Sequence, residues 1–304
     1  MATLCAEWYF RAQSLSFGID WATSHFLVSL YAINLTSIMY KISIVGAGNV
    51  AFRMALFLQA AGHDVECVCA RDLQKAEKVV RALKRVKSDA IAVNDFLQLP
   101  KSDITIIAVS DNAIGQVAGQ LPHKDAFTVH TSGATAMKVL QDAGLQNVGV
   151  FYPLMTLSMS KDLDIRLVPF LLEAHDKYGE ELLVNLVNSL KAEYKMCDSA
   201  KRLQFHTAAI FATNIINYSL SLAYDIASPD FTFLLPSAIE SVRKAFLQNP
   251  ITAQTGPARR GDTRTIEKHR EVLSHDKFQE HLEVYNFLTQ KIFNKYNPDS
   301  NEQL

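Results

Sequence analysis

A glycine motif between a strand-like run and a helix-like run constrains this sequence most. Residues 41–45 read Lys-Ile-Ser-Ile-Val, and Gly46, Gly48 and Ala51 follow at the spacing G-x-G-x-x-A, before a helical stretch that continues to Ala61. Gly46 would allow the tight turn, Gly48 would let phosphates approach the backbone, and the small Ala51 would let helix and strand pack closely. The motif predicts a dinucleotide-binding unit whose phosphates lie at the helix N-terminus.

Strand-like and helix-like segments alternate through roughly the first 200 residues. Such alternation is typical of a doubly wound α/β domain with a parallel sheet. The glycines at 62 and 144 stand where helices should stop. The expected strands are 41–45, 65–69, 90–93, 104–109, 127–130, 148–151, 168–173 and 193–196, and the expected later helices are 73–83, 134–143 and 177–190.

The chain becomes almost wholly helical after Asp198. Residues 199–226 contain neither Gly nor Pro and predict one long helix. Three more helices are expected at 234–248, 264–273 and 277–294. We therefore expect an N-terminal Rossmann domain with a doubly wound parallel sheet, followed by a mostly α-helical domain. The expected boundaries are 39–197 for the first domain, 198–297 for the second and 298–304 for a tail.

The first 38 residues differ in character from the rest. Their apolar stretch from Phe26 to Tyr40 is interrupted by polar residues such as Ser29 and Asn34. A signal peptide needs a basic segment and an unbroken apolar run, and a spanning helix needs about 20 mostly apolar residues. We expect residues 1–38 to be a leader that is disordered or lies upstream of the true start at Met39; membrane attachment and an ordered role are the alternatives.

Charge and cysteine content exclude several classes of partner. Among 304 residues, 30 Lys and Arg balance 31 Asp and Glu, for a formal net charge of -1. This balance gives no electrostatic reason to expect nucleic acid or an anionic membrane as a partner. The four cysteines form no C-x-x-C pair and have no histidine cluster nearby, so neither disulfides nor a metal site is predicted. A reducing, cytoplasmic location is the natural expectation.

The choice of dinucleotide depends on the end of the second expected strand. Arg71 lies there, twenty residues after Ala51. An acidic residue at this place usually holds the ribose 2′-OH of NAD, whereas Arg accommodates the 2′-phosphate of NADP. The neighbouring Asp72 could serve NAD, but it is also well placed to cap the helix from Leu73. The sequence favours NADP, with NAD as the alternative and a solvated charge as the other interpretation of Arg71.

Polar residues follow the fourth and fifth expected strands, at the sheet edge where doubly wound folds bind ligands. Ser110 and Asp111 follow the fourth strand, and the fifth ends in His130-Thr131-Ser132. His130 is a candidate site residue, and a hydrogen-bonded structural histidine is the alternative. The residues expected to contact the cofactor are Gly46, Gly48, Asn49, Val50, Arg71, Val109, Ser110 and Ser132.

The long expected helix carries a polar stripe. At 100° per residue, His206, Thr213, Asn217 and Tyr224 fall within about 20° of one line, with Asn214 about 80° away. A polar group buried without partners costs about 1–3 kcal/mol, so the stripe implies mutual hydrogen bonds or a wet cleft. A polar seam between helices, at a dimer interface, is the alternative to the cleft.

The loop at residues 249–262 concentrates further polar groups. Gly256 and the proline after it predict a turn, and Arg259 and Arg260 offer planar donors suited to a carboxylate or phosphate. Asp262 is placed to cap the next helix. We expect Arg260 to anchor an anionic substrate; an ion pair that stabilises the loop is the alternative.

Several of these segments together resemble a known family. They are Gly-Ala-Gly-Asn-Val-Ala at 46–51, Ile-Ala-Val-Ser-Asp at 107–111, His-Thr-Ser-Gly-Ala at 130–134, His-Thr-Ala-Ala at 206–209 with Asn214, and Thr-Gly-Pro-Ala-Arg-Arg-Gly-Asp at 255–262. Over roughly residues 39–296 the chain is similar to Rossmann-like proteins with a DUF2520 C-terminal domain. That family is described as NADP oxidoreductases and is similar to pyrroline-5-carboxylate reductase and to the 6-phosphogluconate and β-hydroxyacid dehydrogenases. Related dehydrogenases often have His-Pro where this chain has Tyr152-Pro153.

The resemblance implies an NADP-dependent oxidoreductase that acts on a small, anionic carbonyl or imine. Hydride transfer to such a group needs a residue that supplies a proton. A homodimer through the helical domain is expected. The alternative function is a dinucleotide-binding sensor or scaffold without turnover, because a fold does not fix a function. The catalytic candidates are His206, Asn214 and His130, and the substrate-binding candidates are Arg260, Asn217 and Tyr152.

Overall fold

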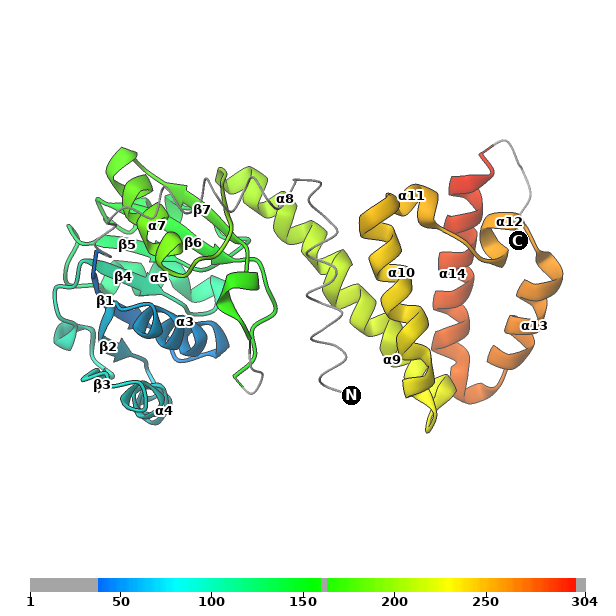
Figure 1. The fold of residues 1–304 in the computed structure, drawn as a ribbon, viewed down its shortest axis with the longest axis horizontal. Helices are drawn as coiled ribbons and strands as arrows, with labels where there is room; N and C mark the ends of the chain where they lie inside the picture. The colour runs from blue at the N-terminus through cyan, green and yellow to red at the C-terminus, as the bar shows by residue number, and fades with distance from the viewer. Residues whose placement is uncertain (1–37, 160–162, 299–304) are drawn as a thin grey trace, which may run out of the picture. The chain divides into compact units, whose positions relative to one another are not determined.

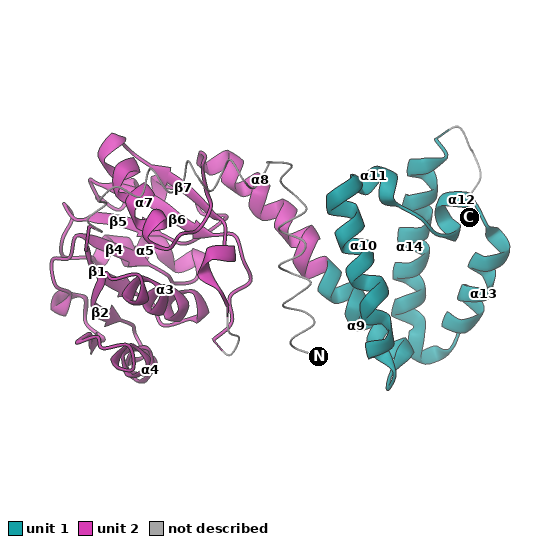
Figure 2. Cartoon of the chain, in the orientation of Figure 1, with its two compact units in different colours: residues 1–31, 216–304 teal, residues 32–215 magenta. Residues whose placement is uncertain are grey.

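The computed structural model describes residues 38–159 and 163–298. The described chain forms two compact units, the first ending at Ile215 and the second beginning at Ile216 (Figures 1 and 2). The predicted domain boundary after Cys197 falls earlier, so the helix that follows it groups with the first unit. Residues 1–37 of the predicted leader and 299–304 of the predicted tail lie outside the described residues, and both remain predictions.

The first unit is built on an eight-stranded sheet with the order β3-β2-β1-β4-β5-β6-β7-β8. Strands β1 to β6 are parallel, as predicted, whereas β7 runs antiparallel to β6 and β8 runs parallel to β7. Each expected strand is present. The bounds are β1 (Lys41–Val45), β2 (Asp64–Cys69), β3 (Ile91–Val93), β4 (Ile104–Ile107), β5 (Phe127–His130), β6 (Val148–Pro153), β7 (Phe170–Ala174) and β8 (Tyr194–Met196).

Helices cover both faces of this sheet, which confirms the doubly wound architecture (Figure 1). Helices α3, α4 and α7 contribute to the larger hydrophobic core, and α5 and α6 contribute to the other. Their bounds are α3 (Asn49–Ala60), α4 (Leu73–Lys84), α5 (Ile114–Gln120), α6 (Lys138–Asp142) and α7 (Lys177–Ser189), with short 3₁₀ helices η1 (Phe96–Gln98), η2 (Asp111–Ala113) and η3 (Ile165–Leu167).

Helix α6 is shorter than the helix expected at 134–143. The Ser132 hydroxyl accepts hydrogen bonds from the backbone N–H groups of Ala134 and Thr135, at 3.1 and 2.9 Å. The backbone N–H of Met137 donates to Ser199 Oγ at 3.1 Å. These bonds hold residues 132–137 in a turn outside the helix, because Ser side chains offer the backbone an alternative to helical bonds.

The long helix after Asp198 contains a π-helical turn. It consists of α8 (Ser199–Ile210), the π segment η4 (Phe211–Ile215) and α9 (Ile216–Ala227). Its extent agrees with the prediction, but its uniform geometry does not. Hydrogen bonds in a π turn run from residue i to i+5, so each residue turns the chain through less than 100°. The single polar line predicted from a uniform helix is therefore wrong beyond Phe211, and Asn214 lies nearer to the line of His206 than expected.

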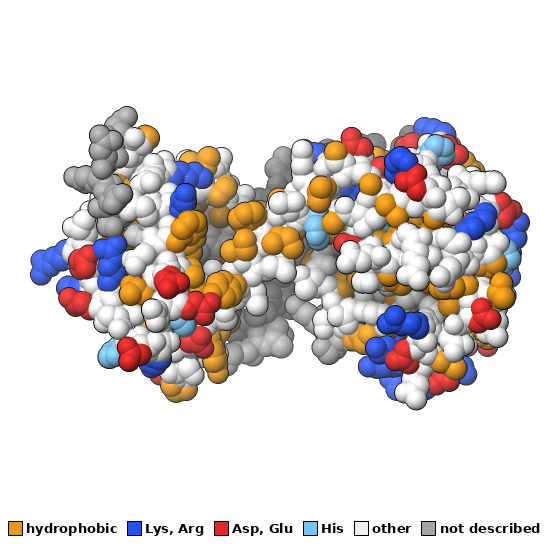
Figure 3. All heavy atoms as spheres, turned by 180° about the vertical axis from the view of Figure 1, so that it is seen from behind, with side chains coloured by type: hydrophobic (Ala, Val, Ile, Leu, Met, Phe, Trp, Pro, Cys, Tyr) orange, Lys and Arg blue, Asp and Glu red, His pale blue; other side chains and the backbone are white. Residues whose placement is uncertain are grey.

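The second unit is helical, as predicted. None of the residues in α9, η5, α10 or α11, all of which the structure describes, is buried. Figure 3 shows hydrophobic side chains gathered on this unit over α9 and α10. Among the residues described, no helix is both long and apolar enough to cross a membrane. The remaining bounds are η5 (Phe231–Leu234), α10 (Leu235–Gln248), α11 (Pro250–Ala253), α12 (Pro257–Arg260), α13 (Thr263–Leu273), η6 (Asp276–Phe278) and α14 (Gln279–Tyr296).

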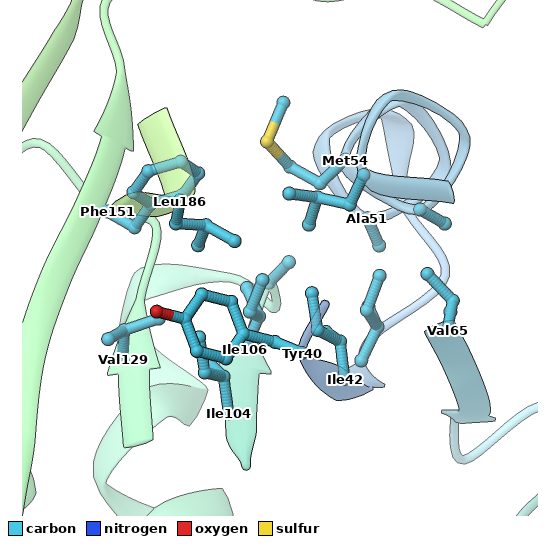
Figure 4. Packing of buried hydrophobic residues seen from close by; sticks show 14 of the residues in the cluster. Tyr40, Ile42, Ala51, Met54, Val65, Ile104, Ile106, Val129, Phe151 and Leu186 are labelled. Carbon is cyan, nitrogen blue, oxygen red and sulfur yellow. The ribbon is translucent and has the colours of Figure 1, made fainter. Parts of the chain in front are cut away.

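Part of the larger hydrophobic core of the first unit lies between the sheet and α3. Ile42, Ile104 and Ile106 come from neighbouring strands and point towards Ala51 and Met54 of the helix (Figure 4). All five side chains are fully buried. Burying a large aliphatic side chain stabilises a fold by about 1.5–3 kcal/mol, so this layer fixes the start of α3 against the sheet. The glycine turn that precedes α3 is thereby held at the carboxyl edge of the sheet.

Candidate functional site

A pocket of about 1170 Å³ lies at the carboxyl end of the strands of the first unit. It lies between the turns that follow β1, β2 and β4, as the doubly wound fold predicts. All the expected cofactor contacts except Ser132 line it. They are Gly46, Gly48, Asn49, Val50, Arg71, Val109 and Ser110.

The glycine turn has the geometry that the motif predicts. Gly46 has a φ of +126°, and a Cβ at this position would lie 2.2 Å from the carbonyl oxygen of Ala108, so a side chain is excluded. Gly48 precedes α3, and apart from Gly48 itself and its two chain neighbours no described residue comes within 4 Å of where its Cβ would stand. The first turn of α3 carries no acidic side chain. The open amide groups at this end of the helix fit the pyrophosphate of a dinucleotide.

Basic side chains line the pocket beyond β2. Arg71 is exposed there, and Lys75 and Lys78 of α4 line the same side. The carboxylate of Asp72 instead accepts hydrogen bonds from the backbone of the first turn of α4. Asp72 therefore serves as the predicted helix cap, and the cationic side chains fit the 2′-phosphate of NADP.

Tyr152 and His206, which are 54 residues apart in sequence, meet at the end of β6. The Tyr152 Oη and His206 Nδ1 atoms are 2.9 Å apart, and the rings pack edge to face. Burial raises the pKa of Tyr152, and the negative charge of Asp111 raises it further. The phenol therefore keeps its proton at neutral pH, in contact with a half-buried imidazole. Asp111 also lines the pocket, so a charged residue of the pocket lining acts on Tyr152.

Gly133 packs directly against this pair. A Cβ at residue 133 would lie 2.6 Å from His206 Nδ1 and 2.7 Å from Tyr152 Cζ. The contact between the two side chains therefore requires glycine at this position. Gly133 belongs to the family segment at 130–134, but no role was predicted for it from the sequence.

His130 lies at the end of β5 and is fully buried. Its Nδ1 accepts a hydrogen bond from the backbone N–H of Ser132 at 3.1 Å. Burial, together with the positive charge of Arg202, lowers the pKa of His130 to about 3. The ring is neutral at physiological pH and holds the turn after β5, which fits the structural interpretation. A catalytic role for His130 remains a prediction.

Ser132 is also buried and lies outside the pocket lining, whereas its neighbour Thr131 lines the pocket. The Ser132 hydroxyl donates to Thr135 Oγ1 at 3.0 Å and accepts from the backbone of Ala134. Its observed function is to shape the turn. Its predicted contact with the cofactor remains untested.

The other predicted polar residues belong to later elements of the chain. Asn214 is exposed on η4, where its Oδ1 accepts a hydrogen bond from Thr213 Oγ1 at 2.8 Å. Asn217 on α9 and Arg260 on α12 belong to the second unit, and both are exposed. Their predicted roles in substrate binding remain predictions.

The two arginines of the 249–262 loop have different environments. Arg259 donates to the carbonyl oxygens of Thr252, at 3.2 Å, and of Gln254, and its guanidinium lies over the Tyr296 ring at 5.0 Å. Arg259 is therefore the arginine that stabilises the loop. The side chain of Asp262 caps α13, as expected.

Cys67 and Cys69 are buried free thiols on β2. Burial raises the pKa of Cys67 to about 12 and that of Cys69 to about 11. Both therefore pack as small apolar side chains. No cluster of His, Cys, Asp or Glu able to hold a metal ion occurs within residues 38–159 and 163–298.

Several residues that the structure brings to the site were not predicted from the sequence. Lys75 and Lys78 share one face of α4 by their i, i+3 spacing, which was a usable signal. Arg202 and Glu173 form a buried ion pair near the Tyr152–His206 pair. Their signal was weak: a charged residue four positions before His206, and a single acid in an apolar strand.

Comparison with known proteins supports the resemblance. Residues 41–132 match the family described as NADP oxidoreductase, coenzyme F420-dependent, and residues 168–292 match DUF2520, a domain of unknown function. No curated protein matches the sequence. A solved structure from Bacteroides fragilis, titled a "putative NADP oxidoreductase", is 27% identical, covers 84% of this chain and 98% of its own, and has a TM-score of 0.74.

Two further structures share the fold. A protein from Thermotoga maritima is 19% identical and covers 85% of this chain and 99% of its own, with a TM-score of 0.61. A reductive aminase from Aspergillus terreus, solved with NADPH and ethyl-5-oxohexanoate, is 14% identical and covers 84% and 93%, with a TM-score of 0.62. The match to an NADP oxidoreductase family in residues 41–132 and to DUF2520 in residues 168–292, together with the solved structures, indicates an NAD(P)-dependent oxidoreductase.

Proposed function

We propose that this protein transfers a hydride between the nicotinamide of NADP and a small, anionic carbonyl or imine substrate. The observation that carries the proposal is the contact between Tyr152 Oη and His206 Nδ1 beside the carboxyl end of the sheet. A phenol that keeps its proton, backed by a histidine, is a suitable proton source for a reduced oxygen or nitrogen. NADP, when bound, supplies or accepts the hydride.

The two side chains can act as a short proton relay. In the direction of reduction, the π electron pair of C=O or C=N becomes a lone pair on oxygen or nitrogen. That atom takes the proton of Tyr152 Oη, and an imidazolium Nδ1–H of His206 returns a proton to Oη. One proton therefore moves from His206 to the substrate, and the reverse direction runs the same steps backwards.

The remaining polar candidates would bind the substrate. The Arg260 guanidinium is exposed and suits a carboxylate or phosphate through two parallel hydrogen bonds. Asn214 and Asn217 would supply neutral donors and acceptors that orient the substrate. Arg260→Lys should then weaken substrate binding, because a point charge cannot replace the planar fork.

The helical unit supports the proposal of a homodimer. Large apolar side chains such as Phe233 and Phe246 are exposed on η5 and α10. Contiguous apolar surface of this kind marks an interaction site in most proteins, and a two-fold dimer is the commonest symmetric assembly. A second copy of the chain is therefore the proposed cover of the face formed by α9, η5, α10 and α11. A cytoplasmic location remains part of the proposal.

The steady-state rate of NADPH oxidation, measured with a panel of small 2-oxo acids and cyclic imines, tests the function. With the substrate that responds, Tyr152→Phe and His206→Ala should lower kcat by about 10²–10⁴, the usual loss for a general acid. The NADPH dissociation constant should stay within twofold of wild type. Tyr178→Phe, at an exposed tyrosine of α7, is the matched control and should leave both quantities unchanged.

The alternative function makes the opposite prediction. Tight NADPH binding without turnover across the panel would support a sensor or scaffold. Full turnover in Tyr152→Phe would contradict the proton role of the pair.

A further inference from the structure

A buried ion pair lies next to the proposed proton source. Arg202 is fully buried on α8, and its Nη1 atom donates to Glu173 Oε2 on β7. Its Nη2 atom donates to the carbonyl oxygen of Thr135 at 2.5 Å. Burying a charge costs free energy unless it is paired and hydrogen-bonded, so a pair at this place needs a reason beyond stability.

The pair joins three segments of the first unit. Ser199, in the first turn of α8, donates its hydroxyl to Glu173 at 2.8 Å and accepts a hydrogen bond from the backbone N–H of Met137 at 3.1 Å. Strand β7, the start of α8 and the turn after β5 therefore meet in one network. The turn is the segment that carries Gly133.

Each of these three segments is connected to the Tyr152–His206 pair. His206 follows Arg202 by four residues, so both lie on one face of α8. Glu173 is opposite Val150 in the register of β6 and β7, and Leu171 is opposite Tyr152. Because alternate residues of a strand share a face, Glu173 and Tyr152 project from the same face of the sheet. Gly133, two residues before Thr135, packs on both members of the pair.

The charge of Arg202 also acts on the surrounding titratable groups. It lowers the pKa of His130, and it opposes the effects of burial and of Asp111 on the pKa of Tyr152. Glu173 balances this charge locally. Loss of the pair would therefore change both the place and the electrostatic environment of the proton source.

We infer that the buried Arg202–Glu173 ion pair is a positioning element that holds His206 against Tyr152. The inference rests on the proposed function only for its consequence for turnover. Its structural part, the contact between the two side chains, is testable without a substrate. Neither Arg202 nor Glu173 is proposed to touch the substrate or to transfer a proton.

Nitrogen NMR of the histidine side chains in the full-length protein provides that test. The nine histidines are labelled with ¹⁵N, and His206→Gln assigns the signal of interest. Tyr152→Phe gives the reference spectrum of a His206 ring that has lost its partner. Replacing the pair by apolar residues, Arg202→Met with Glu173→Leu, keeps the buried volume filled, a change that buried ion pairs often tolerate.

We expect His206 in this double variant to show the Nδ1 chemical shift of Tyr152→Phe. The NADPH dissociation constant should stay within twofold of wild type, because the pocket lining is not touched. The matched control is Arg81→Met with Glu77→Leu, which removes an exposed ion pair of α4 by the same substitutions. The control should keep the wild-type His206 signal.

A wild-type His206 signal in the folded double variant overturns the inference. Should the double variant fail to fold, Arg202→Lys and Ser199→Ala replace it. Both should move the His206 signal part of the way towards that of Tyr152→Phe, and two unchanged spectra would overturn the inference equally.

The activity assay separates this inference from the proposed function. With a responsive substrate, the double variant should lose at least tenfold in kcat. A shifted His206 signal together with full turnover in Tyr152→Phe would leave the positioning role intact and refute the proton role of the pair.

Discussion

The two units differ in how completely they bury their own apolar side chains. In the first, strand residues such as Ile42, Ile44 and Ile106 are fully buried under helices of the same unit. In the second, Phe233 and Phe246 are mostly exposed, and four successive elements from α9 to α11 bury none of their described residues. The first unit holds its own core, pocket and proposed proton source. The second leaves an apolar face exposed, which we propose is covered by a second copy of the chain.

Because of this difference, we expect mutations in the two units to change different properties of the protein. Substitutions in the nucleotide-binding unit should change cofactor binding, chemistry or local stability and leave assembly intact. Substitutions on the apolar face of the helical unit should change assembly and leave NADPH binding intact.

The largest effect is expected at the apolar face. Phe246 on α10 and Leu97 on η1 are each 81% exposed, so Leu97 in the first unit is a matched control position for Phe246 in the second. Phe246→Asp should weaken the dimer by about 30- to 1000-fold, because a central aromatic residue contributes about 2–4 kcal/mol to an interface. Leu97→Asp should leave the dimer unchanged. Sedimentation velocity over a concentration series measures both, and equal behaviour of the two variants would break the comparison.

The next effect concerns acid stability of the first unit. The pKa of His130 is about 3 in the fold and near 6.5 in an unfolded chain, so between these values only the unfolded state binds the proton. Stability should therefore fall by about 1.4 kcal/mol for each pH unit below 6.5, which amounts to about 2–3 kcal/mol at pH 4.5. His130→Asn should remove this part of the loss. Urea unfolding of both proteins at pH 7.0 and pH 4.5 measures it, and parallel losses would contradict the assigned pKa.

A further effect sharpens the assignment of the pocket to NADP. Arg71→Ala should weaken NADPH binding by about 10- to 100-fold, because a charge-assisted hydrogen bond contributes about 1.5–3 kcal/mol. NADH binding should change by less than twofold, since NADH lacks the 2′-phosphate. Titration calorimetry gives both constants. Tighter binding of NADH by wild type would move the assignment to NAD.

The smallest effect compares the neighbouring arginines of the helical unit. Arg259→Ala should lower the free energy of unfolding by about 1–2 kcal/mol, because it removes hydrogen bonds to two carbonyls and the contact with Tyr296. Arg260→Ala should change it by less than about 0.5 kcal/mol, as at other exposed positions. Thermal unfolding measures both. A larger loss at Arg260 would make it the structural arginine of the loop.

Much of the fold could be predicted because its signals are local. The β-branched runs, the glycine turn at Gly46 and the cap at Asp72 each depend on a few neighbouring residues. The antiparallel direction of β7 could not be predicted, because an apolar run has no direction. The π turn from Phe211 to Ile215 likewise has no local signature in a sequence without Gly or Pro.

The candidate site was predictable only where one segment carries it. The pocket residues follow from the motif and from the ends of three strands. The partner of His206 could not be found in the same way, since helical phase relates it only to residues on its own helix. The structure instead places Tyr152 of β6 against it, a contact made by tertiary packing and by the absence of a side chain at Gly133.

The two buried thiols of β2 offer a way to measure how fast the first unit opens, separately from the second. Cys67 and Cys69 lie in the core of the first unit, and no cysteine occurs after Cys197 in the sequence. Because their pKa values are about 12 and about 11 and both side chains are buried, neither thiol should react with an alkylating reagent while the first unit is folded. In a protein carrying Cys5→Ser and Cys197→Ser, the rate of alkylation would report the opening of the first unit alone. In the same protein, the rate at which the proposed dimer dissociates would report separately on the helical unit.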